Sequence, residues 1–120
     1  MLIDLNNSSV LNKVTFEDFS KIDIRVGTIV SAESFSKAIK PAYKLKIDFG
    51  ELGILNSSAQ ITHRYSFEDL VGKQIIAVVN FPKKQIANFM SECLVLGAVN
   101  EKDVILISTE DTVMNGLRIH

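Results

Sequence analysis

The sequence predicts an all-β domain, a small barrel with short helical insertions. Apolar and polar residues alternate in several short runs, most clearly over 43–49, and this period of two is typical of strands with one buried face. Glycine, proline and short polar residues separate the runs, as they do in turns. At 120 residues, 47% apolar and 22% charged, the chain is long enough for one compact core and not for two.

Residues 1–14 show no clear period. We treat them as an N-terminal extension of uncertain order and assign 15–120 to the domain. Thr15, with Asp18 three residues later, resembles a capping box in which the acid stands in for the usual glutamate. This pattern predicts a short helix that ends near Ser20.

Two strands are expected next. Alternation from Ile22 to Ser31 predicts the first, and Gly27 inside it predicts a bend or bulge where the strand serves two parts of a barrel. The second strand is expected over 43–49 with its apolar residues inward. Lys44 and Lys46 then share the outer face.

The middle of the chain predicts two more strands and a helical insert. A third strand is expected over 54–58, and 62–70 reads as a short helix or turn closed by Gly72. Lys73–Phe81 contains an apolar run without alternation, which predicts a strand covered on both faces. Residues 83–89 are expected to form a turn of helix.

Two final strands are expected over 93–98 and 104–108. Five or six short strands with a helical insert between the third and fourth predict a closed Greek-key barrel of the OB type. In such barrels the connection between the first two strands belongs to the ligand surface.

That connection is rich in lysine, although the chain has 13 basic and 14 acidic residues and a net charge of -1. The segment 37–46 holds four lysines and no acid, and a second acid-free window lies between Asp69 and Glu92. Clustered positive charge suits an anionic ligand, of which nucleic acid is the commonest large example. The alternative for each cluster is a solvated surface. The candidate residues for contacting nucleic acid are Lys37, Lys40, Lys44, Lys46, Lys83 and Lys84.

A stretch of short polar side chains at 56–62 follows the third strand. Such side chains can hydrogen-bond a peptide backbone, a sugar or a phosphate, but they equally form local turn bonds. Aromatic residues are few, with seven Phe, two Tyr and no Trp, so this is not the stacking platform of a single-strand binder. Recognition of nucleic acid by shape and phosphate contacts is therefore expected.

The reactive groups of an enzyme are missing from the sequence. His63 and His120 are the two histidines and Cys93 is the one cysteine, so no metal cluster can be drawn and neither catalysis nor a cofactor is expected. The lone cysteine, the acidic N-terminus without a long apolar region and the absence of an 18-residue apolar run together predict a cytoplasmic protein without membrane insertion.

Several short motifs resemble the CsaA family, a bacterial offshoot of the tRNA-binding domain appended to methionyl-tRNA synthetases. The resemblance runs in order from Phe16 to Ile119. Its motifs are Asp-Ile-Arg-Val-Gly-Thr-Ile at 23–29, Ser-Ser-Ala-Gln-Ile at 57–61, Asn-Phe-Pro at 80–82, Ile-Ala at 86–87, Ser-Glu at 91–92, Leu-Val-Leu-Gly at 94–97 and Asn-Gly at 115–116.

The resemblance implies a homodimeric OB barrel in the cytoplasm that binds tRNA and acts as a chaperone for unfolded or export-bound polypeptides. The alternative is a dedicated peptide-binding chaperone with little or no tRNA binding. The chain departs from its relatives, which tend to have small or basic residues, at Asn88, Met90 and His63. It therefore carries less positive charge on this surface than the resemblance implies. The matched positions expected to line or support a shared ligand pocket are Ser57, Ser58, Gln60, Asn80, Pro82, Ser91 and Glu92.

Two further expectations concern the whole chain. The apolar runs at 75–79 and 104–107, together with the apolar N-terminal residues, are more than one small barrel easily hides, which favours a partner surface and a homodimer. An accessory domain of a larger tRNA-handling enzyme is disfavoured, because the chain starts with Met and ends just past its last expected strand.

Overall fold

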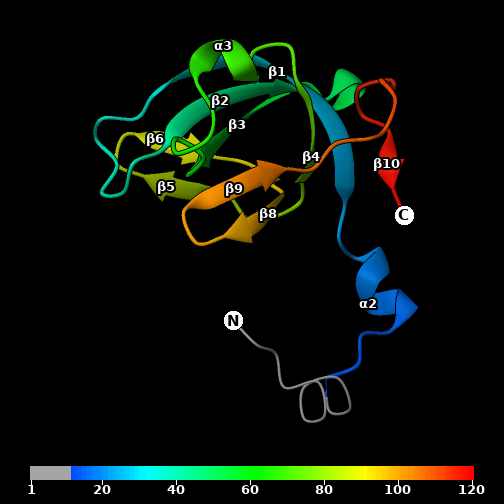
Figure 1. Cartoon of the computed structure of the whole chain (residues 1–120). Helices are drawn as coiled ribbons and strands as arrows, with labels where there is room; N and C mark the ends of the chain where they lie inside the picture. The colour runs from blue at the N-terminus through cyan, green and yellow to red at the C-terminus, as the bar shows by residue number, and fades with distance from the viewer. Residues whose placement is uncertain (1–11) are drawn as a thin grey trace.

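A six-stranded antiparallel sheet wraps into a nearly closed barrel in the computed structural model, which describes residues 12–120 (Figure 1). The strand order is β3-β2-β1-β4-β7, and β10 pairs with β1 beside this path. The predicted all-β barrel with short helical insertions is confirmed. Its strands are β1 (Ile24–Ser34), β2 (Tyr43–Asp48), β3 (Ile54–Ala59), β4 (Gln74–Val78), β7 (Leu94–Val95) and β10 (Arg118–Ile119).

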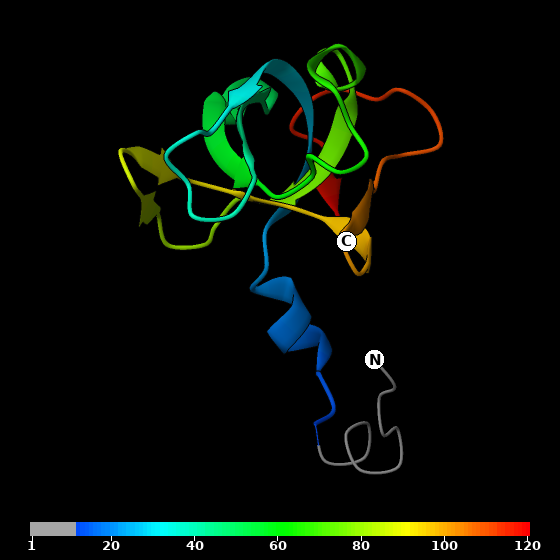
Figure 2. The same cartoon turned by 60° about the vertical axis from the view of Figure 1, so that its left-hand side comes forward.

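Within residues 12–120, two hairpins and three short helical segments complete the fold. One hairpin pairs β5 (Lys84–Ile86) with β6 (Phe89–Ser91), and the other pairs β8 (Gly97–Asn100) with β9 (Asp103–Leu106). In both views the β5–β6 hairpin lies beside the loop that joins β1 to β2 (Figures 1 and 2). The helical segments are α2 (Phe16–Ser20), the 3₁₀ helix η1 (Gly50–Leu52) and α3 (Phe67–Leu70).

Strand β1 serves two parts of the barrel, as its length and Gly27 suggested. Its first half, Ile24–Thr28, pairs with β4, and its second half pairs with β2. The irregularity lies at Val30 and not at Gly27, since the register with β2 shifts between Ile29 and Ser31. Gly27 has another role: a Cβ there would lie 2.7 Å from the Ile47 side chain.

The core fills the barrel with side chains from β1, β2 and β4. Phe49, Ile29, Leu45 and Ile47 have no exposed surface, as the alternation over 43–49 predicts. The apolar run of β4 is buried from Ile75 to Val78 within this one chain. That run therefore does not require a partner surface, so this part of the argument for a dimer was wrong.

The C-terminal third departs from prediction in two places. Residues 83–89 are not a turn of helix but hold β5 and the hairpin turn, where Ala87 has a φ of 50°. The run 93–98 is not one strand, because β7 ends at Val95 and β8 begins a new sheet at Gly97. In the described residues, no helix is long and apolar enough to cross a bilayer.

Helix α2 stands away from the barrel in both views (Figures 1 and 2). The predicted capping box is present: the Asp18 N–H donates to Thr15 Oγ1 at 3.0 Å, and the Thr15 N–H donates to Asp18 Oδ2 at 3.2 Å. No residue of α2 is buried, and Phe16 is 77% exposed. The expected extension 1–14 lies mostly outside the described residues, and its described part, 12–14, is exposed.

Candidate functional site

Hydrogen bonds that mostly involve side chains close the barrel between β3 and residues 91–93, at the end of β6. The Asn56 N–H donates to Glu92 Oε1 at 2.9 Å, and the Glu92 N–H donates back to the Asn56 carbonyl at 2.8 Å. The Ser58 N–H donates to Ser91 Oγ at 3.2 Å, and Ser57 Oγ donates to the Cys93 carbonyl at 2.9 Å. We call these six residues the seam.

Four of the seven predicted pocket residues thus belong to the seam. Ser57 is buried, and its hydroxyl bonds within the protein. One carboxylate oxygen of Glu92 accepts from the Asn56 N–H of β3, and the other forms an ion pair with Lys83, whose Nζ lies 3.6 Å away. Ser58 differs, because only its backbone N–H bonds within the seam, and the residue also lines two cavities.

Asn80 lies apart from the seam and joins the end of β4 to the start of β1. Its Oδ1 accepts from the Asp23 N–H at 2.9 Å, and its Nδ2 donates to the Lys21 carbonyl at 2.7 Å. Both ends of its amide are therefore occupied by backbone. Pro82 is exposed, and neither residue lines the cavities near Ser58.

The six candidate lysines divide by their contacts. Lys44 is held: its Nζ lies 3.5 Å from Glu33 and 5.5 Å and 5.8 Å from the ring centroids of Phe35 and Phe89. Those two rings also pack edge to face at 5.4 Å. Lys44 therefore joins β2 to the β1–β2 loop and to the β5–β6 hairpin. Lys83 pairs with Glu92, as described above.

Three of the remaining lysines meet at one cavity of about 420 Å³. Lys37 and Lys40 reach it from the β1–β2 loop, and Lys84 reaches it from β5. Its other polar lining residues are Ser58, Gln60 and Gln85, and no carboxylate lines it. We call it the lysine pocket. Lys46 is exposed on β2 and lies outside it.

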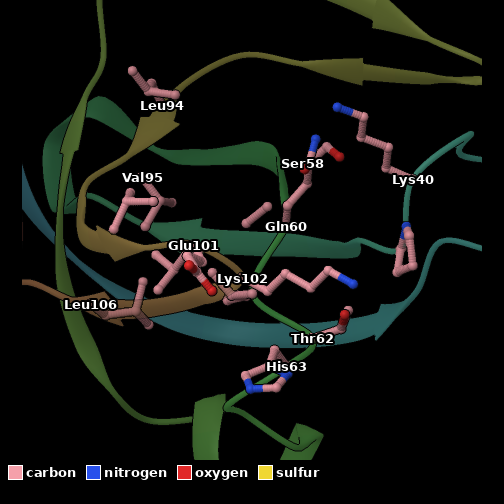
Figure 3. A pocket seen from close by; sticks show the side chains of 15 residues that line it. Lys40, Ser58, Gln60, Thr62, His63, Leu94, Val95, Glu101, Lys102 and Leu106 are labelled. Carbon is pink, nitrogen blue, oxygen red and sulfur yellow. The ribbon is translucent and has the colours of Figure 1, made fainter. Parts of the chain in front are cut away.

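A larger cleft of about 770 Å³ opens on the other side of Lys40, Ser58 and Gln60. In Figure 3 these three side chains lie at one end, while Leu94, Val95 and Leu106 lie at the other. We call it the apolar cleft. It also has polar residues at its rim, namely Thr62, His63, Glu101 and Lys102.

Sequence reasoning missed the apolar wall of this cleft. Val99, 73% exposed on β8, is the clearest signal, because an apolar side chain on a two-stranded hairpin has no core of its own to enter. The hairpin is tied to the barrel by Arg64, whose guanidinium donates to both carboxylate oxygens of Asp103 at 2.7 Å. This pair lowers the pKa of Asp103, chiefly through the hydrogen bond.

The described residues offer little reactive chemistry. Burial raises the pKa of the Cys93 thiol to about 12, so at neutral pH it is protonated and weakly nucleophilic. Within 12–120, no group of three or more His, Cys, Asp or Glu side chains is arranged to hold a metal ion. The arrangement instead offers lysine ammonium groups, amides, hydroxyls and an apolar wall, which are the groups of a binding surface.

Comparisons with known proteins match almost the whole barrel. The family model described as "Putative tRNA binding domain" matches residues 24–118. The crystal structure of chaperone CsaA from Bacillus anthracis has 54% sequence identity and a TM-score of 0.85, covering 89% of this chain and 98% of that chain. The CsaA chaperone protein from Picrophilus torridus has 56% identity and a TM-score of 0.84, covering 89% and 99%.

Longer proteins also contain this domain. The methionine–tRNA ligase of Methanococcoides burtonii is 38% identical over 108 residues, which are 89% of this chain and 16% of the ligase. The ligase of Bdellovibrio bacteriovorus is 34% identical over the same shares. The chain thus spans about a sixth of the length of these curated relatives.

Proposed function

The chain belongs to the tRNA-binding domain family, and from this premise we propose that it is a non-catalytic protein that binds tRNA through its lysines. The lysine pocket carries this proposal. Lys37, Lys40 and Lys84 converge on one cavity without a carboxylate in its lining, in a chain whose net charge is only -1. Such a concentration of ammonium groups matches the phosphates of RNA.

The proposed tRNA contacts are four of the six candidate lysines. Among the described residues, Lys37, Lys40, Lys46 and Lys84 have no ion pair, whereas Lys44 and Lys83 each have a glutamate partner. Four phosphate contacts give a log–log salt slope between about -3 and -4, at roughly 0.7 to 0.9 per contact.

A filter-binding titration of total tRNA at several salt concentrations tests this function. Binding that weakens with the expected slope supports it. Lys37→Glu with Lys40→Glu should weaken binding and flatten the slope, whereas Lys21→Gln, at the end of α2, should change neither. Binding that is absent at low salt, or independent of salt, contradicts the proposal.

A second function, capture of unfolded or export-bound polypeptide, is supported by the apolar cleft. Two of the similar structures are named CsaA chaperones, and the cleft combines apolar residues with hydroxyl and amide groups that can bond a peptide backbone. Apolar capture should persist when salt is raised, unlike phosphate binding. A denatured client that aggregates equally fast with and without the protein, at low and high salt, would exclude this function.

We also propose a homodimer in the cytoplasm. The supporting observation is the apolar surface left around α2 and the C-terminal segment, where Val14, Phe16 and Met114 are each more than 70% exposed. Sedimentation of the wild type should give a dimer at micromolar concentration, and Phe16→Asp should shift it toward monomer. A monomeric wild type at that concentration contradicts the dimer.

A further inference from the structure

The lysine pocket and the apolar cleft are neighbours that share one wall. Lys40, Ser58 and Gln60 line both cavities. On one side of this wall lie Lys37 and Lys84, and on the other lie the apolar side chains of β7, β8 and β9. A ligand that crosses the wall therefore meets cations first and an apolar surface second.

The two halves differ sharply in chemistry. The lysine pocket has three ammonium groups and no carboxylate in its lining. The apolar cleft has one acid, Glu101, at a rim that also carries Lys102 and His63. Its wall is formed by Ile61, Leu94, Val95, Val99, Val104 and Leu106.

We propose that the two cavities form one bipartite site for an unpaired nucleotide of single-stranded RNA, with the phosphate in the lysine pocket and the base in the apolar cleft. The proposal rests on tRNA binding as the function and specifies which part of the RNA is bound. Among the described residues, no Phe, Tyr or Trp lines the cleft for stacking. This site therefore differs from the recognition by shape and phosphate contacts that the sequence predicts: an unstacked base presents an apolar face, which aliphatic side chains can contact, and polar edges. The cleft can match both parts of a base. Its aliphatic side chains can contact the apolar face, and the polar side chains of Gln60, Thr62 and His63 can hydrogen-bond the edges.

A base within a duplex cannot use this site. Its faces are covered by stacking, and only its edges and phosphates are accessible. The duplex would reach the lysines and leave the apolar cleft empty. A peptide could fill the apolar cleft, but a peptide of ordinary composition carries carboxylates at only some positions and offsets them with its own cations, whereas every nucleotide of RNA carries a phosphate. Charge complementarity therefore favours RNA over polypeptide.

The position of the lysines is set by contacts behind the pocket. The Phe35 and Phe89 rings pack at 5.4 Å, and Lys44 Nζ lies over both. These contacts join the loop that carries Lys37 and Lys40 to the hairpin that carries Lys84. The pocket is thus built from two segments held together, which differs from a set of independent surface lysines.

The test uses the full chain and a fluorescently labelled six-nucleotide single-stranded RNA, with a duplex of the same sequence for comparison. Lys37→Gln with Lys84→Gln removes two phosphate contacts. It should weaken single-strand binding about tenfold near 0.1 M salt and reduce the salt slope by about 1.4. Lys21→Gln is the control for loss of a distant lysine and should change neither quantity.

The apolar half is tested separately. Val99→Asp places a carboxylate where the base would lie and should weaken binding of the single strand more than it weakens binding of the duplex, and equal losses would contradict the site. Leu52→Asp, an exposed apolar position outside both cavities, is its control. Amide chemical shifts should move at Ser58 and Gln60 when the RNA is added, and circular dichroism and thermal unfolding check that each variant is folded.

Several outcomes would overturn the bipartite site. They are duplex binding as tight as single-strand binding, equal affinities for the lysine variant and its control, and displacement of the RNA by inorganic phosphate as effectively as by a mononucleotide. Binding of an apolar peptide in the cleft without competition from the RNA would overturn it as well. Tight tRNA binding that survives Lys37→Gln with Lys84→Gln refutes this site and leaves the proposed function standing, whereas absence of any tRNA binding refutes that function itself.

Discussion

Ser57 and Ser58 are adjacent in β3 and have opposite surroundings. Ser57 is buried, and its hydroxyl satisfies the Cys93 carbonyl across the seam. Ser58 is half-buried and lines both the lysine pocket and the apolar cleft. Because strand residues alternate between faces, the Ser57 side chain stabilises the barrel and the Ser58 side chain faces the two cavities.

This difference predicts that alanine lowers stability at Ser57 and RNA binding at Ser58. Ser57→Ala leaves a buried carbonyl without its partner and should lower the free energy of unfolding by about 1–3 kcal/mol. Ser58→Ala should change stability by less than about 0.5 kcal/mol and should weaken RNA binding instead. Urea unfolding and filter binding of both variants make the comparison. Equal losses of stability in the two variants would refute the separate roles assigned to Ser57 and Ser58.

Gly27 predicts a second effect at the level of one residue. A Cβ here would approach the Ile47 side chain and the Phe49 ring at 2.7 Å, and both neighbours are fully buried. Gly27→Ala should therefore cost about 1–3 kcal/mol through overpacking. The double variant Gly27→Ala with Phe49→Leu should be less destabilised than the sum of the two single variants, because the smaller side chain makes room. Additive losses in chemical denaturation would contradict this explanation.

At the level of elements, Lys44 and Lys46 occupy the same outer face of β2 and differ in their contacts. Lys44→Ala removes the ion pair with Glu33 and the contacts with two aromatic rings. Hydrogen exchange should then be faster in the β5–β6 hairpin by about fivefold, equivalent to roughly 1 kcal/mol of local opening. Lys46→Ala should leave that hairpin unchanged. Equal exchange in the two variants would contradict the role assigned to Lys44.

The elements that the sequence predicted best are those with strict alternation or a cap. Strand β2 and the capping box at Thr15 are confirmed because each depends on residues close together in the chain. Strand β5 was mistaken for helix, since its three residues carry no period and pairing with β6 decides their conformation. Tertiary contacts of this kind override local preference.

The candidate site was predictable to the same extent. Lys40, Ser58 and Gln60 do meet, because a barrel brings the β1–β2 loop to the end of β3. The contacts of Asn80 were beyond prediction, since its partners lie 57 and 59 residues away. The apolar cleft was missed for a similar reason: only the folded chain places β8 opposite the end of β3.

For the whole molecule, two surface carboxylates link stability to pH. Hydrogen bonds from Ser66 lower the pKa of Asp69, and hydrogen bonds from Arg64 lower the pKa of Asp103. A carboxylate whose pKa is lower in the folded state stabilises the fold above its unfolded pKa, near 3.9, and this contribution is lost as pH falls through the folded value.

The free energy of unfolding should therefore decline as pH falls below about 5. Asp103→Asn should remove the part of this loss of unfolding free energy that comes from Asp103, and Arg64→Gln should remove the same part. Combining them should add nothing further, since both remove one interaction. Urea titrations across about pH 2.5–7, a range that spans the ordinary aspartate pKa, measure this. A double variant with twice the effect would show that the two residues act independently.

The seam has one more consequence, for the solubility of the protein itself. A strand at the edge of a sheet exposes a row of unpaired amide and carbonyl groups. A foreign chain can pair with them as an additional strand, which is the first step of amyloid-like aggregation. On β3 the outward groups of Asn56 and the outward amide of Ser58 are already occupied by Glu92 and Ser91. At these two residues β3 therefore cannot serve as a template for a foreign strand, which favours the solubility of the protein.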